Sequence, residues 1–350
     1  MDGTRRRGWF TGGGWLERCR DGLSGLIVLW LIGLAAASGG AEAAGRRSIA
    51  WEPLPLPTEA NAAGLYAVAP DVPTCRSGRL SSAERNRVLA AVNDIRRLHN
   101  LGEVVWDGSQ EEAAMSAALV FAANGQLSHR PSGDWRCSSA ASARGAASSN
   151  IHLWVGTPGS ALRPSEDVVI GFLTDVNNRV AGSVGHRRWL LDPFLKRVAF
   201  GRVNALVDGL LYDGAALTVV DPGAGAGARA AEPNRGVARA DHWAYPEGRY
   251  PAKYFHPDAM LSFSAIVDLN DRAANLAVDY SNASITLRRA DGGTLPVTQV
   301  SHDHQVWGLP NSLQFRAPGL VADVEYEVLI QGVRVEGRLR DYRYRFRIES

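Results

Sequence analysis

The sequence predicts an α+β domain followed by an all-β (Ig-like) sandwich. Two observations in the first two thirds of the chain support the α+β domain: segments with helical spacing of apolar residues and strand-like segments both occur, and they lack the regular strand–helix–strand rhythm of α/β proteins. In the last 110 residues, short β-prone runs are separated by turn signals. A length of 350 residues exceeds an average single domain and agrees with two domains.

The first forty-odd residues have the organisation of a secretory signal peptide. Basic residues, among them Arg5–Arg7, precede an apolar stretch at 23–37, and a small-x-small cleavage pattern follows at 41–43. We therefore expect residues 1–43 to be removed and the mature chain, beginning near Ala44, to be secreted or periplasmic with no membrane span. An uncleaved anchor is the alternative, although the apolar stretch is short for a span.

Export makes the three cysteines informative. Cys19 lies in the segment expected to be removed, which leaves Cys75 and Cys137 as the remaining pair. In an oxidising compartment two remaining cysteines are natural partners, so we expect a disulfide between them. Two unpaired buried thiols are the alternative.

Composition and charge exclude one class of partner. The hydrophobic content of 45% and the charged content of 21% are ordinary for a soluble globular protein. The formal net charge is only +2, and no basic stripe stands out along the chain. We therefore expect no nucleic-acid partner.

The first elements follow an extended N-terminal arm at 44–74, which is rich in proline and has no sustained periodicity. Ser81 and Glu84 have the spacing of a capping box, so a helix is expected to begin at Ser81. Its inward positions, at helical spacing, are Val88, Val92, Ile95 and His99. Asn100 and Gly102 are expected to end this helix.

Two further helices and a pair of strands complete the predicted α+β domain. Ser109 and Glu112 form a second capping-box pattern, which predicts an alanine-rich helix to about Asn124. A third helix is expected near Ser165. Its inward residues would be Val168, Val169, Phe172 and Val176. Strand-like alternation at 197–204 and 215–220 surrounds a turn signal at Asp208-Gly209.

The amino-acid composition of the chain changes after residue 222. Residues 223–240 are rich in glycine and alanine, cannot bury a core, and are predicted to be a linker. The sandwich is assigned to 241–350, with β-prone runs at 261–267, 275–280, 284–287, 323–331 and 342–348. Trp243 and Tyr245 are interpreted as packing anchors between the linker and the sandwich, with a sugar-stacking platform as the alternative.

Three short motifs stand out within residues 75–222. His129 lies in Leu-Ser-His-Arg-Pro, Ser149 and Asn150 lie in Ser-Ser-Asn-Ile, and His186 lies in Gly-His-Arg-Arg-Trp-Leu-Leu-Asp-Pro. This ordered set resembles the CAP superfamily, which includes plant pathogenesis-related proteins, venom antigen 5 and the bacterial SCP-like proteins. The last motif is the most specific of the three.

The resemblance implies an α-β-α sandwich with an open cleft. In that family two histidines and two acidic residues often face the cleft and can hold a divalent metal. His129 and His186 match the histidines, and Asp175, expected on the third helix, lies about where one acidic residue is expected. Ser149 replaces the glutamate that many members have before Asn150. Two imidazoles and one carboxylate would suit zinc with an open fourth position; histidines that are hydrogen-bonded without an ion are the alternative.

Several other polar residues have two interpretations. His152 is either a third imidazole near the cleft or a surface histidine. His302 and His304 share a face of an expected strand, where a solvated strand edge is favoured over a metal site. Arg187 and Arg188 either meet acidic partners or cap carbonyls at a helix end.

Two functions are compatible with these residues. In the favoured one, an exported, non-catalytic binding or envelope-associated protein takes a small or lipid-like ligand or a cell-envelope component, and no residue is assigned a catalytic role. In the alternative, His129, His186 and Asp175 hold a metal that activates water in a hydrolase. A third idea, Ser149 as a nucleophile, lacks a Gly-x-Ser-x-Gly context. The serine in place of glutamate weakens catalysis more than binding.

Overall fold

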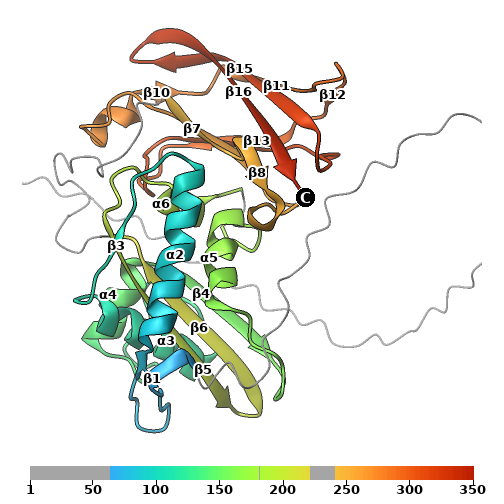
Figure 1. Cartoon of the computed structure of the whole chain (residues 1–350). Coiled ribbons are helices and arrows are strands. Elements are labelled where there is room, and N and C mark those ends of the chain that lie inside the picture. The colour runs from blue at the N-terminus through green and yellow to red at the C-terminus, as the bar shows by residue number, and fades with distance from the viewer. Residues whose placement is uncertain (1–63, 181, 221–240) are drawn as a thin grey trace, which may run out of the picture. The chain divides into compact units, whose positions relative to one another are not determined.

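The structure of the chain is a computed structural model that describes residues 64–180, 182–220 and 241–350 (Figure 1). The expected signal peptide at 1–43 with Cys19, the first part of the expected arm, and the expected linker at 223–240 lie outside the described residues. All of the described residues belong to one compact unit.

A four-stranded sheet forms the middle layer of the first domain. Its strand order is β3 (Val105–Trp106), β5 (Arg197–Val207), β6 (Leu210–Thr218) and β4 (Ser149–Gly156). Strands β5 and β6 pair antiparallel around Asp208 and Gly209, both of which have positive φ. The sequence-based expectation of two strands around this turn is confirmed. Among the described strands, β4 pairs only with β6 and is therefore an edge of the sheet.

Helices cover both faces of this sheet (Figure 1). On one face, α3 (Glu111–Asn124) approaches so closely that a Cβ on Gly201 would lie 2.2 Å from the carbonyl carbon of Ala114. Helix α4 (Ala140–Ala147) packs beside α3. The next residue of β5, Arg202, points to the opposite face and donates to Ser165 Oγ of α5 (Ser165–Thr174) at 2.9 Å. Helix α2 (Ser82–Leu98) packs against α5. The domain is an α-β-α sandwich.

The helix boundaries test the predicted caps. Ser81 is the N-cap of α2, and its side chain accepts a hydrogen bond from Glu84 N at 3.2 Å, as expected. The predicted cap of α3 is wrong, because Gln110 and not Ser109 is the N-cap; Ser109 lies one residue earlier, where its hydroxyl donates to the Asp107 carboxylate at 2.6 Å. Helix α3 therefore begins at Glu111, while its end at Asn124 is confirmed.

The third predicted helix is shorter than expected, and two helices were not predicted. Helix α5 ends at Thr174 because Asp175 adopts the left-handed conformation with φ of 56°, so Val176 lies outside it. The small residues of α4 have little apolar periodicity, although Ser139 and Ser142 cap it reciprocally. Helix α6 (Gly185–Leu190) is only six residues long.

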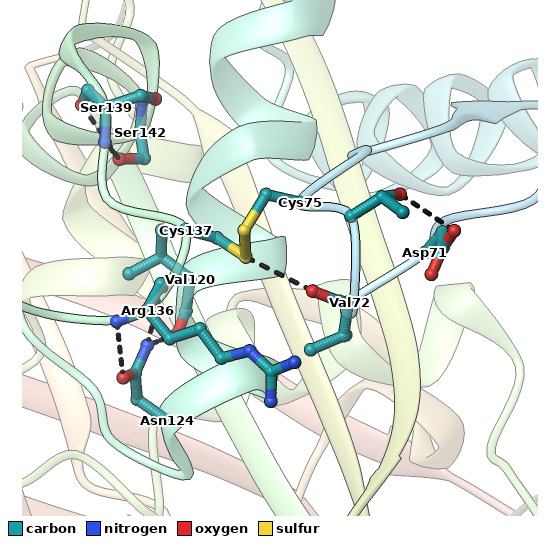
Figure 2. Close-up of a disulfide and its surroundings, with 10 residues drawn as sticks. Asp71, Val72, Cys75, Val120, Asn124, Arg136, Cys137, Ser139 and Ser142 are labelled. Carbon is teal, nitrogen blue, oxygen red and sulfur yellow. Dashed lines mark hydrogen bonds between the residues drawn. A yellow bond between two sulfur atoms is a disulfide. The ribbon is translucent and has the colours of Figure 1, made fainter.

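The disulfide between Cys75 and Cys137 is present, with the two Cα atoms 5.1 Å apart (Figure 2). It ties the lead-in of the domain to the segment after α3. Within that segment, Asn124 donates to Arg136 O at 3.0 Å and accepts from Arg136 N at 2.9 Å. The last part of the expected arm contributes β1 (Tyr66–Val68), which pairs with β2 (Arg79–Leu80).

The C-terminal region is a β-sandwich of two sheets. One sheet has the order β12 (Thr294–Leu295), β11 (Ser284–Arg289), β15 (Glu325–Val335), β16 (Arg338–Glu349) and β8 (Gly248–Pro251), with β10 (Val278–Asp279) also on β15. The other has the order β13 (Thr298–Asp303), β14 (Ser312–Arg316), β9 (Leu261–Ala265) and β7 (His242–Tyr245). The ring of Phe263 lies 5.0 Å from that of Tyr342, which joins the two sheets. The expected strand at 275–280 is reduced to β10, because Ala273–Leu276 forms a 3-10 turn.

Within the described part of the chain, no helix combines the length and the hydropathy needed to cross a membrane.

Candidate functional site

His129 is held by the layer that contains α3 and α4. It follows the end of α3, and its Nδ1 donates to the carbonyl oxygen of Ala146 on α4 at 2.9 Å. This hydrogen bond places the ring proton on Nδ1, so Nε2 keeps its lone pair. Partial burial lowers the pKa of His129, and the nearby charge of His186 lowers it further. The imidazole is therefore favoured in its neutral form.

His186 is held from the opposite layer. It lies on α6, and its Nδ1 is 2.8 Å from Oδ1 of Asp175, the residue that ends α5. The other carboxylate oxygen, Oδ2, accepts from the backbone N–H groups of His186 at 3.1 Å and of Arg187 at 3.4 Å. The Phe172 ring lies 5.2 Å from the imidazole. Asp175 thus fixes both the ring orientation and the start of α6, and Nε2 is the nitrogen open to a ligand.

Strand β4 contributes side chains to the surroundings of both histidines. Successive side chains of a strand point to opposite faces, so Asn150 and His152 share one face while Ser149 and Ile151 share the other. Asn150 donates to His186 O at 3.0 Å, and Ile151 packs in a cluster with residues of α3 and α4. Ser149 therefore lies on the His129 side. The first residues of the edge strand β4 therefore contact the segment of His186 through Asn150 and the α3–α4 layer that holds His129 through Ile151.

Two polar groups on β4 add to this arrangement. The Ser149 hydroxyl is buried and has no hydrogen-bond partner among the described residues. His152 is half-buried rather than a surface histidine; its burial lowers its pKa, and the charge of His186 acts in the same direction. His186 thus acts electrostatically on both His129 and His152. That His129 and His186 face a single cavity stays a prediction.

The donor set does not fit a resident zinc ion. Catalytic zinc usually has three protein ligands, and the sequence-based expectation counted on Asp175 as the carboxylate beside His129 and His186. Both oxygens of Asp175 are instead engaged by α6. Ser149 supplies no carboxylate, and the described residues contain no group of three or more His, Cys, Asp or Glu side chains suited to a metal.

The remaining histidines and arginines are also placed. His302 is exposed on β13, whereas His304 lies beyond the end of that strand and contacts Val278 O, so the two do not share a strand face as expected. Arg187 caps the last carbonyls of α5, with Nη2 2.8 Å from Thr174 O. Arg188 meets an acidic partner, Asp303, at 2.6 Å. Helix capping is thus confirmed for Arg187, and an acidic partner is confirmed for Arg188.

A family model of the cysteine-rich secretory protein family, CAP, matches residues 89–206. The chain carries a CAP domain. The match runs from α2 into β5 and includes the candidate site residues His129, Ser149, Asn150, Asp175 and His186. No curated protein matches the chain. The sandwich formed by residues 241–350 lies outside the CAP match.

Sequence reasoning missed how the CAP domain meets the sandwich. Trp243 and Tyr245 were interpreted as anchors between the linker and the sandwich. In the structure, Trp243 Nε1 donates to His99 O at the end of α2, at 3.0 Å. The Arg187 guanidinium stacks on the Tyr245 ring, with its Cζ 3.8 Å from the ring centroid. Trp243 and Tyr245 anchor the sandwich to the CAP domain. Aromatic residues that follow a linker indicate that their side chains are buried, but they do not indicate the surface against which these side chains pack.

Proposed function

We propose that this protein is exported and that its CAP domain binds a small or lipid-like ligand without catalysing a reaction. The observation that carries the proposal is the state of the two histidines. His129 and His186 each have Nδ1 held by an oxygen, which leaves Nε2 for a ligand, while Asp175 is occupied in orienting His186. Such a site can accept a hydrogen bond from a ligand at each Nε2, and Asp175, which orients His186, is not free to bind that ligand itself.

Two features support export to a secreted or periplasmic location. Residues 1–43 have the organisation of a signal peptide. The disulfide between Cys75 and Cys137 is of a kind that persists in oxidising compartments and is rare in the cytosol.

The polar chemistry of the site favours a ligand that donates hydrogen bonds. The neutral imidazole of His129, with its proton on Nδ1, accepts at Nε2, and the unpartnered Ser149 hydroxyl can both accept and donate. Leu127, Trp135 and Leu153, partly buried, pack on the apolar cluster beside His129. An amphiphile with a hydroxyl head and an apolar body matches these groups better than a carboxylate does.

A matched set of probes tests this proposal. Protein labelled with ¹⁵N at histidine would be titrated with 1-decanol, decanoate and decane, which share one chain length and differ in the head group. We expect 1-decanol to move the Nε2 resonances of His129 and His186 at the lowest concentration. The substitution His129→Ala should weaken binding, whereas His302→Ala, at an exposed histidine of the sandwich, should not. Equal responses to the three probes, or none, would contradict the proposal.

The metal-assisted hydrolase is the alternative and makes the opposite prediction. Hydrolysis of a p-nitrophenyl ester would be followed with zinc added and then with a chelator. We expect no zinc-dependent rate above that of the protein-free solution. A zinc-dependent rate that His129→Ala abolishes would replace the binding proposal with the hydrolase.

A further inference from the structure

The segment that carries His186 is built against the C-terminal sandwich. A Cβ on Gly185 would lie 3.0 Å from Cε3 of Trp307, so the indole packs directly on the residue before His186. Arg188 donates through Nη2 to Leu309 O at 2.8 Å. Gly308, at φ of 69°, approaches the Arg188 carbonyl so closely that a Cβ there would lie 2.3 Å from its oxygen. The sandwich thus contacts α6 on both sides of His186.

Arg187 makes the central connection. Its side chain is fully buried, with Nε 2.6 Å from Leu173 O and Nη2 2.8 Å from Thr174 O, the two carbonyls that precede Asp175. Its Nη1 donates to Met260 O at 2.7 Å and to Ser262 Oγ at 3.0 Å, both in the sandwich. One guanidinium therefore binds the end of α5 and the sandwich at once, in a planar geometry that lysine cannot reproduce.

Helix α6 has little stability of its own. A six-residue helix lies far below the length at which isolated helices form, so its position depends on tertiary contacts. The contacts described above come from Asp175 on one side and from the sandwich on the other.

We propose that Arg187 is a positioning residue through which the C-terminal sandwich sets the geometry of the Asp175–His186 pair. The sandwich is then part of the ligand site's construction and not only an attached module. An effect of Arg187 on ligand affinity rests on the proposed binding function. An effect of Arg187 on the hydrogen bond between Asp175 and His186 does not.

Two serines on β9 provide a matched test. Ser262 and Ser264 are both 8% exposed and lie on the same face of the strand. Ser262 accepts from Arg187, whereas Ser264 donates to Asn311 O within the sandwich at 2.8 Å. The substitutions Ser262→Ala and Ser264→Ala would each be made in the full mature chain, and the exchange of the histidine Nδ1–H protons with water would be measured by NMR.

We expect Ser262→Ala to speed exchange of the His186 Nδ1–H several-fold, because loss of the Arg187 contact loosens the Asp175 hydrogen bond. The Nδ1–H of His129 should not change, since its partner Ala146 lies in the CAP domain. Ser264→Ala should leave both protons unchanged even if it lowers the unfolding temperature equally. Equal effects of the two substitutions, or no effect of Ser262→Ala on His186, would overturn the proposal.

A second variant and a ligand measurement separate the two proposals. Arg187→Lys, if it folds, should speed exchange at His186 more than Ser262→Ala does. If exchange at His186 responds as expected and 1-decanol fails to bind the wild-type protein, the binding function is wrong and the positioning role stands. If 1-decanol binds and exchange at His186 is insensitive to both variants, the positioning role is wrong and the binding function stands.

Discussion

The two histidines of the site are held in different ways. Among the described residues, His129 is hydrogen-bonded within the CAP domain, to Ala146 of the adjacent helix. His186 depends on Asp175 and, through its neighbours in α6, on the sandwich. The difference teaches that, although the motifs of the site all lie in the CAP domain, one of its two histidines is positioned partly by contacts with another domain. Perturbations of the sandwich should therefore reach His186 and spare His129.

The largest effect is expected from removing Arg187. Arg187→Ala would leave the carbonyls of Leu173, Thr174 and Met260 without this partner and would open a cavity in the contact with the sandwich. We expect a loss of about 3–5 kcal/mol of unfolding free energy, measured by urea denaturation. Arg97→Ala, which removes an exposed arginine paired with Asp94 and Glu103, should cost less than ~1 kcal/mol. Similar losses for the two variants would contradict this account.

Removing the disulfide should come next and should act on the other side of the site. It closes a loop of 62 residues, and the chain-entropy estimate for such a loop is about 4 kcal/mol. The double variant Cys75→Ala, Cys137→Ala should lower the unfolding free energy by about this amount. Since Cys137 lies in the segment that follows His129, exchange of the His129 Nδ1–H should increase more than that of His186. The reverse order would break the comparison between the two histidines.

Acid should weaken the contact between the CAP domain and the sandwich. His99 lies buried there, 3.1 Å from the Tyr250 hydroxyl; burial is the main cause that lowers its pKa from 6.5 to about 4, with Arg187 and Arg96 acting in the same direction and Glu247 against it. Between these values the unfolded chain binds a proton that the folded chain does not, so unfolding free energy falls as the pH falls. The full loss is about 3 kcal/mol, reached below pH ~4.

Urea denaturation at pH 7, 5.5 and 4 would measure this effect. His99→Phe should reduce the slope between pH 7 and 4, because phenylalanine cannot be protonated. An unchanged slope would assign the acid sensitivity to other groups.

The sequence predicted the parts of the fold that depend on local chemistry. Ser81 caps α2 as expected, and the turn at Asp208-Gly209 joins the predicted strands. Ser109 is not the cap of α3, because its N–H and its hydroxyl both donate to the Asp107 carboxylate and the helix begins only after Gln110. Sequence spacing cannot decide between two such local partners.

For the candidate site, sequence motifs identified the residues but not their roles. Asp175 was expected on the third helix, facing the cleft near the two histidines, yet it terminates α5 in a left-handed conformation and binds His186. One of Arg187 and Arg188 was expected to cap a helix end, and Arg187 does so, but its contacts with Met260 and Ser262 span more than 70 positions. No local pattern encodes a partner at that distance.

The smallest effect is expected at Ser149, where it separates ligand binding from stability. Its hydroxyl is buried without a partner among the described residues, and such a group costs free energy instead of contributing it. Ser149→Ala should therefore change the unfolding free energy by no more than ~0.5 kcal/mol, or raise it, while weakening the binding of 1-decanol. Ser165→Ala is the control, because that buried hydroxyl accepts from Arg202 at 2.9 Å and its loss should cost about 1–2 kcal/mol. Ser149→Ala with lower stability and unchanged binding of 1-decanol would show that this hydroxyl serves the fold and not a ligand.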